Sequence, residues 1–138
     1  MIDAKSYLRQ VEKFDVLIQN KLIELQQWRD IAQGITASIG GERVQSTRSQ
    51  QKMADAVVKC VDMEKEINAL VDSLIGIKKD VITTIEQLDN PTEYDILHKR
   101  YIQFMTLQDI ADRYGREYGW VTTSHGRALK NVQKILNK

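Results

Sequence analysis

The chain has 138 residues, of which 20 are Lys or Arg and 19 are Asp or Glu, so its formal net charge is only +1. This length excludes a large multidomain enzyme, and the near-neutral charge removes any global electrostatic argument for nucleic-acid binding. One cysteine and two histidines exclude an intrachain disulfide and leave too few ligands for a zinc finger. Seven glycines and one proline offer few turns for a multistranded sheet, so the composition favours helices.

The beginning of the chain has no basic flank followed by an apolar core, which argues against a signal peptide. No apolar stretch approaches the roughly 18 residues of a membrane span. A single cysteine is typical of a reducing compartment. We therefore expect a cytoplasmic protein with no membrane partner, no metal and no cofactor.

Two long segments carry apolar residues at helical spacing, from Asp3 to about Gln33 and from about Gln51 to Leu88. Residues 34–50 between them are read as a polar connection. The first stripe contains Tyr7, Val11, Phe14, Ile18, Leu25, Trp28 and Ala32, widened by Leu8, Leu22 and Ile31. The second contains Val57, Cys60, Ile67, Val71, Leu74, Val81, Ile85 and Leu88. Residues 1–89 are therefore predicted to form a long antiparallel helical hairpin, coiled-coil-like, that serves oligomerisation or partner binding.

Asn90-Pro91 marks a boundary, because Asn is a good N-cap and Pro is tolerated in the first turn of a helix. Residues 91–138 hold eight basic and five acidic residues, whereas residues 1–90 hold 12 basic and 14 acidic ones. Positive charge is thus concentrated in the last third of the chain, as expected of a part that faces phosphates.

Three helices are predicted within residues 90–138. The first runs from about Thr92 to Ile102. The second begins after Thr106, which forms a capping box with Asp109, and ends at Gly115. The third begins near residues 117–119 and runs to about Leu136.

The last two helices have the spacing of a helix-turn-helix. Ala111 is small at the point where the last helix should cross the helix before it. Gly115 gives the turn its backbone freedom, and Val121 is expected to pack against Ile110. The predicted fold is therefore all-α, a helical hairpin followed by a C-terminal helix-turn-helix domain at residues 90–138.

The segment from Tyr94 to Ile135 resembles region 4 of sigma-70-type transcription factors, which docks a helix-turn-helix on the −35 promoter element. Leu107-Gln108-Asp109-Ile110-Ala111 is similar to the opening helix of that family, and Arg127-Ala128-Leu129-Lys130 to the end of its recognition helix. The whole chain is also similar to a phage and prophage family of Gram-positive bacteria, a domain of unknown function. The similarity lies in its helical N-terminal half, Arg43-Val44-Gln45-Ser46 and His125 to Leu129. That family looks related to the ArpU/RinA-like late transcription regulators.

This resemblance implies a phage protein that binds double-stranded DNA in the cytoplasm of a bacterial host, with host RNA polymerase as a further partner. The wide apolar stripes predict a homodimer. The expected DNA-binding residues are Arg113, Arg116, Tyr118, Trp120, Thr122, Thr123, Arg127 and Lys130.

These residues have different expected roles. Arg113 and Arg116 flank the turn, where backbone phosphates lie. Trp120 is included because it stands next to Val121 in the helix, so its side chain should point away from the core. Arg127 and Lys130, with Lys134, either neutralise phosphates or complement the helix dipole.

The sequence departs from the sigma pattern where bases are read. The positions of that family's Arg-Glu pair and Gln are occupied by Tyr118, Gly119 and Thr123, so base recognition must differ. His98 and His125 are interpreted as structural residues, with His125 placed to bond to a neighbouring helix. The sequence has no triad, phosphate loop or paired-carboxylate site, and we expect no enzymatic activity.

The preferred function is a sequence-specific transcriptional regulator that acts at a promoter. One alternative is a DNA-packaging protein similar to a small terminase subunit, which would require a ring-like oligomer. Another is an adaptor that binds RNA polymerase and does not itself bind DNA, which the departures from the sigma pattern favour.

Overall fold

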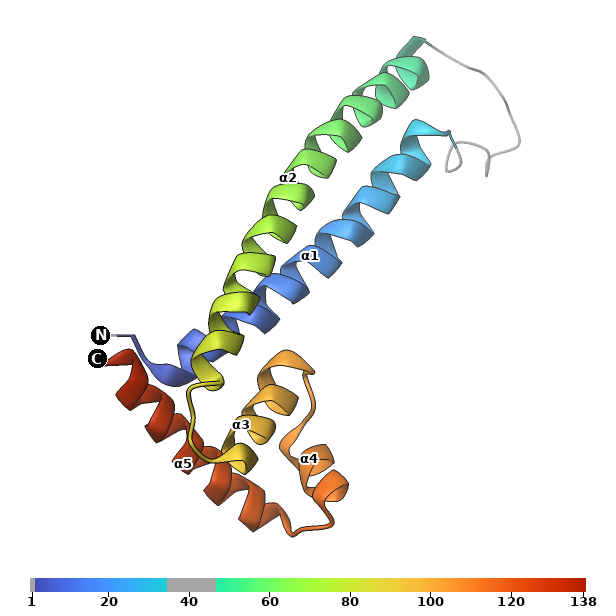
Figure 1. Cartoon of the computed structure of the whole chain (residues 1–138). Coiled ribbons are helices and arrows are strands. Elements are labelled where there is room, and N and C mark those ends of the chain that lie inside the picture. The colour runs from blue at the N-terminus through green and yellow to red at the C-terminus, as the bar shows by residue number, and fades with distance from the viewer. Residues whose placement is uncertain (1, 35–46) are drawn as a thin grey trace. The chain divides into compact units, whose positions relative to one another are not determined.

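The computed structural model describes residues 2–34 and 47–138, and over these residues the chain is all-helical (Figure 1). This confirms the all-α class. The connecting residues 35–46, with Arg43-Val44-Gln45-Ser46, lie outside the described residues. None of the described helices is long and apolar enough to cross a bilayer.

Two long helices, α1 (Ala4–Ala32) and α2 (Thr47–Ile85), form the first part of the chain. The start of α1 agrees with the prediction. The polar connection predicted for residues 34–50 is wrong at its end, because residues 47–50 already belong to α2. Thr and Ser are common at helix starts as well as in loops. The polar composition of residues 47–50 therefore led to their being predicted as part of the connection.

The described chain packs as two compact units, one of residues 1–15 with 74–138 and the other of residues 16–73. We call them the first unit and the second unit. The division between the units falls within α1 and within α2, whereas the sequence suggested a division at residue 90. Both long helices contribute to both units.

The second unit is built on an apolar cluster between α1 and α2. Its buried members are Leu25, Cys60, Met63 and Ile67, with Trp28, Ala32 and Val71 partly buried against them. Two ion pairs also join the helices, Lys21 Nζ to Glu66 Oε1 at 2.8 Å and Arg29 Nη2 to Glu64 Oε1 at 3.0 Å. Core positions for Trp28 and Cys60 are thereby confirmed.

Two of the residues named in the predicted apolar stripes are exposed instead of buried. Val57 is 51% exposed and Leu22 is 43% exposed, whereas Ala56 is fully buried. The reason is spacing: Ala56, Cys60, Met63 and Ile67 recur at steps of four, three and four, which keeps them on one helical face. Val57 lies one residue off that face, about 100° around the helix.

The first unit contains the remaining helical elements: α3 (Pro91–Leu97), the π-helical turn η2 (His98–Ile102), α4 (Leu107–Tyr114) and α5 (Tyr118–Leu136). As predicted, Asn90 caps α3, and its Oδ1 accepts from the backbone N–H of Thr92 at 2.8 Å. The helix predicted to reach Ile102 instead changes to π geometry at His98.

The main core of the first unit joins both ends of the sequence. It combines the first turns of α1 and the last turns of α2 with the end of α3, η2 and α5. Its buried members are Ala4, Tyr7, Leu8, Val11, Val81, Ile85, Leu97, Tyr101, Ile102, Ala128 and Val132. The Tyr7 hydroxyl donates to Asp80 Oδ2 at 2.5 Å and lies 2.9 Å from Thr84 Oγ1. Burial, then the Asp80 hydrogen bond, raises the pKa of Tyr7 to about 12. This core fixes α5 against the start of α1.

Candidate nucleic-acid interface

The candidate interface begins with α4, whose first turn is held by its own side chains. Thr106 Oγ1 accepts from the Asp109 backbone N–H at 3.1 Å, and Asp109 Oδ2 accepts from the Thr106 N–H at 3.4 Å. This is the capping box predicted from the sequence. It sets the start of α4 without help from other elements.

The turn after α4 depends on Gly115. This residue has a φ of 63°, in the left-handed region, and caps the C-terminus of α4. Its N–H donates to the carbonyl of Asp112 at 3.2 Å, and the Arg116 N–H donates to that of Ala111 at 3.0 Å. Left-handed backbone suits glycine, which has no Cβ, so the predicted end of α4 is confirmed.

A second core cluster of the first unit joins α3, α4 and α5. Its members Ile96, Ile110, Ala111 and Val121 are all fully buried. Val121 and Ile110 belong to one cluster, as the sequence predicted, and Ala111 is fully buried within it. With Gly115, this cluster sets the angle at which α5 leaves α4.

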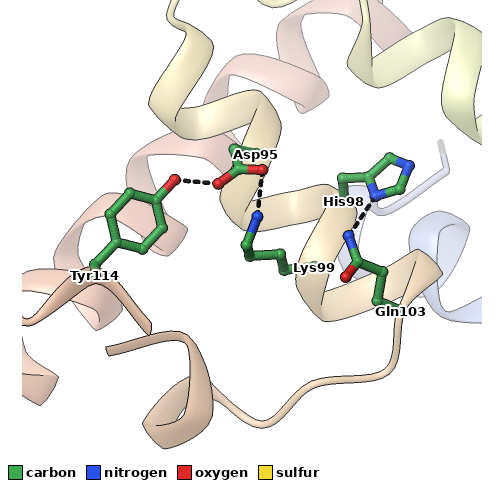
Figure 2. Close-up of polar contacts among 5 residues, drawn as sticks. All are labelled: Asp95, His98, Lys99, Gln103 and Tyr114. Carbon is green, nitrogen blue, oxygen red and sulfur yellow. Dashed lines mark hydrogen bonds and ion pairs between the residues drawn. The ribbon is translucent and has the colours of Figure 1, made fainter. Parts of the chain in front are cut away.

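Polar contacts tie α4 to α3 as well (Figure 2). The Tyr114 hydroxyl donates to Asp95 Oδ2, and Lys99 Nζ donates to Asp95 Oδ1 at 2.6 Å. Partial burial alone would raise the pKa of Asp95, but the hydrogen bonds from Lys99 and Tyr114 outweigh it and the pKa lies below its usual value. Burial and the bond to Asp95 raise the pKa of Tyr114 to about 12. Nearby, His98 Nδ1 and Gln103 Nε2 are 2.9 Å apart.

The exposed side of α5 carries a row of polar and basic residues. Thr123, Arg127, Lys130 and Lys134 are exposed and follow one another at steps of four, three and four, while Val121, Ala128 and Val132 are buried. We call these four residues the α5 row. Helical geometry puts the row on the side opposite the buried residues. Helix α5 contains no acidic residue, and within the described part of the chain none of the row's basic groups has an ion pair.

Around the turn, Arg113 and Arg116 are exposed, as is Tyr118, which is 50% exposed. The expectation for Trp120 is wrong, because its indole is half-buried and packs on the second core cluster. Its ring lies 5.3 Å from that of Tyr114 and 4.7 Å below the Arg116 guanidinium. The ring of Tyr114, whose hydroxyl donates to Asp95, is therefore part of the surface on which the indole packs.

Thr122 and Thr123, which were also predicted to bind DNA, differ in the exposure of their side chains. Thr122 is half-buried and its hydroxyl donates to the Gly119 carbonyl at 3.0 Å, whereas Thr123 is exposed. The structural role predicted for His125 is confirmed, because its Nε2 lies 2.8 Å from the Tyr101 hydroxyl and the two rings stack.

The exposed set therefore contains Arg113, Arg116, Tyr118, Thr123, Arg127 and Lys130, together with Lys134, which the sequence had offered as a phosphate contact or a partner of the helix dipole. The spacing of Lys134 from Lys130 already pointed to a shared face. One acidic group, Glu117, is exposed at the N-cap of α5. Guanidinium, ammonium and hydroxyl groups of this kind suit phosphate oxygens and base edges. Across residues 2–34 and 47–138, no cluster of His, Cys, Asp and Glu is arranged to hold a metal ion.

Comparisons of the chain with protein-family models, with curated proteins and with solved structures found no match.

Proposed function

We propose that this chain is a phage-encoded, sequence-specific transcriptional regulator, in which α4, Gly115 and α5 act as a helix-turn-helix on double-stranded DNA. The supporting observation is the α5 row, with three exposed cations on a helix that has no acidic residue. The buried contacts of Ala111 and Val121 hold that helix with its polar side in solvent. The proposed activity is binding, without catalysis.

Within this proposal the contacts divide into two kinds. Arg113, Arg127, Lys130 and Lys134 neutralise backbone phosphates, which gives affinity without sequence information. Tyr118 and Thr123 lie where α5 enters the major groove, and their hydroxyl and methyl groups read base edges. Arg116 stacks on Trp120, so its guanidinium is held near the start of the helix.

The proposed assembly is a homodimer that acts in the bacterial cytoplasm with host RNA polymerase at a promoter. The second unit of the chain supports self-association, because Val16, Ile23, Val57, Val58 and Val61 are each 46–60% exposed there. A second copy would cover such apolar surface. Two copies would present two α5 helices to half-sites about one DNA turn, or a multiple of it, apart.

A second candidate function is an adaptor that keeps this shape but binds polymerase and not DNA. The observation that favours it is the start of α5, where Gly119 offers no side chain and the acidic Glu117 is exposed. A carboxylate there repels phosphate. If DNA binding is the function, Glu117→Gln tightens it; if the adaptor function holds, the variant has no effect on DNA.

The proposal is tested by titrating the protein with a fluorescently labelled duplex of about 30 base pairs, which spans about three helical turns. The double variant Arg127→Gln/Lys130→Gln is compared with Lys59→Gln/Lys65→Gln, which removes the same charge from exposed positions of α2. We expect the α5 variant to bind roughly tenfold more weakly at about 100 mM salt, with a salt slope lower by about 1.8. Equal binding by the two variants would contradict the proposal.

A further inference from the structure

We propose that Arg116 recognises a guanine in the major groove, and that the indole of Trp120 holds the guanidinium in position for this contact. This inference rests on the proposed function and assigns a base to one residue of that site. From its place in the turn alone, Arg116 was expected to contact a phosphate. The surroundings of its guanidinium indicate a base contact instead.

The guanidinium of Arg116 lies over the ring of Trp120, with 4.7 Å between its central carbon and the ring centroid. A cation is attracted to the negative face of an aromatic ring, and indole is the strongest such partner. Trp120 lies in the first turn of α5, and Arg116 stands just before that helix. The contact therefore keeps the guanidinium beside the N-terminal end of α5, which is the part of a recognition helix that reaches base edges.

The indole is itself held by the rest of the first unit. It packs on the second core cluster, and its ring lies 5.3 Å from that of Tyr114 on α4. The Tyr114 hydroxyl donates to Asp95 Oδ2 on α3, and Lys99 Nζ donates to Asp95 Oδ1 at 2.6 Å (Figure 2). A chain of contacts thus runs from α3 through Tyr114 and Trp120 to the guanidinium of Arg116.

The N–H groups of Arg116 are available to a ligand. Its side chain is exposed, and in the described part of the chain it takes part in no ion pair. The neighbouring carboxylate of Glu117 is also exposed and forms no ion pair with it. Since an aromatic ring is not a conventional hydrogen-bond acceptor, the contact with Trp120 leaves the donors of the guanidinium to water or to DNA.

A guanidinium with a restricted orientation is suited to guanine. A phosphate contact can be made by any cation within reach, such as the exposed lysines of the α5 row. Guanine instead accepts two parallel hydrogen bonds from a guanidinium, at O6 and N7, so its recognition depends on orientation. The contact with Trp120 restricts that orientation before DNA binds, which reduces the conformational entropy lost on binding.

The test selects binding sites from a library of duplexes of about 30 base pairs with randomised central positions. Full-length wild type is compared with Arg116→Lys, which keeps the charge but loses the paired hydrogen bonds, and with Trp120→Leu, which keeps an apolar side chain but removes the ring. We expect wild type to prefer a guanine at one position of the selected motif. Both variants should lose roughly tenfold of that preference and keep the preferences at other positions.

Two further variants complete the comparison. Arg113→Lys is the matched control, because Arg113 is an exposed arginine at the same turn, and among the described residues its guanidinium lies over no aromatic ring. It should keep every base preference. Trp120→Phe keeps a weaker ring in the same place and should lose roughly two- to threefold of the guanine preference. Thermal unfolding checks that each variant is folded, and Arg116→Lys tests the base contact independently of the core because Arg116 is exposed.

The outcomes separate the two proposals. If wild type selects a motif that Arg116→Lys leaves unchanged at every position, the inference is overturned and the proposed function stands. A folded Trp120→Leu that keeps the guanine preference, or that loses all preferences alike, overturns the positioning role of Trp120. If Trp120→Leu does not fold, an unchanged guanine preference in Trp120→Phe overturns that role. A wild type that selects no motif contradicts the proposed function, and the inference fails with it.

Discussion

At the scale of single residues, His125 connects the stability of the first unit to pH. Burial lowers its pKa below the usual value of 6.5, and the charges of Arg100 and Lys5 lower it further. The unfolded chain therefore takes up a proton at higher pH than the folded chain. The free energy of unfolding is highest above the unfolded pKa and falls as the pH drops from there toward the folded pKa.

Replacing this histidine should remove that dependence. We expect His125→Gln to lower the free energy of unfolding by about 1 kcal/mol at neutral pH, through the lost Tyr101 contact, and to lose less than the wild type on acidification. Urea unfolding between about pH 7.5 and about pH 5.5 measures both effects. His98→Gln is the matched control. The same fall with pH in wild type and His125→Gln would show that His125 is not the responsible group.

Contacts between neighbours in sequence were predictable at this scale, and distant ones were not. The Thr106–Asp109 capping box and the Asn90 cap are local patterns, so the sequence alone indicated them. The position of Trp120 was missed because it depends on Tyr114, which is itself held by Asp95 from another helix.

At the scale of elements, the turn between α4 and α5 determines how α5 is presented. Gly115→Ala places a Cβ on left-handed backbone, so we expect a loss of about 1 kcal/mol in the free energy of unfolding. Gly126→Ala is the control, because Gly126 is helical and an added Cβ meets nothing within 4 Å. That variant should gain about 0.5–1 kcal/mol. Equal effects of the two substitutions, measured by urea unfolding, would refute this role of the turn.

The helices were predicted well where apolar spacing and caps agree, as in α1, α4 and α5. The sequence analysis placed Val57 on the buried face of α2 because Val is more apolar than Ala. In the structure Ala56 is buried there and Val57 is exposed. The change to π geometry at His98 has no signal in the residue pattern, since its hydrogen-bond register is set by packing.

At the scale of the whole molecule, the C-terminal helices share their core with the beginning of the chain. Leu8→Ala should therefore cost about 2–5 kcal/mol and speed hydrogen exchange throughout α5, because Leu8 is fully buried in that core. Leu22→Ala removes the same atoms from a side chain that is 43% exposed and should cost less than about 1 kcal/mol. If Leu8→Ala leaves exchange in α5 unchanged, the shared core does not stabilise that helix.

This shared core was beyond sequence reasoning. The hydrogen bond from Ala4 to Gln133 joins residues 129 positions apart in the sequence, and no local pattern predicts such a pairing. The sequence accordingly assigned the start of α1 to a separate hairpin.

Self-association also belongs to this scale. Val57 and Val61 stand four residues apart on α2 and are 51% and 46% exposed, so a second copy is expected to cover them. We expect sedimentation velocity at micromolar concentration to give a dimer for the wild type and a monomer for Val57→Lys/Val61→Lys. A monomeric wild type would contradict the dimer.

The central claim is that the exposed side of α5 binds specific duplex DNA. The most direct measurement is to incubate the purified protein with sheared DNA from its source genome at physiological salt and to sequence the retained fragments. The proposed function predicts one or two sharp peaks ahead of a late operon, which disappear for Arg127→Gln/Lys130→Gln. Uniform retention, no retention, or peaks that persist in this variant would contradict it.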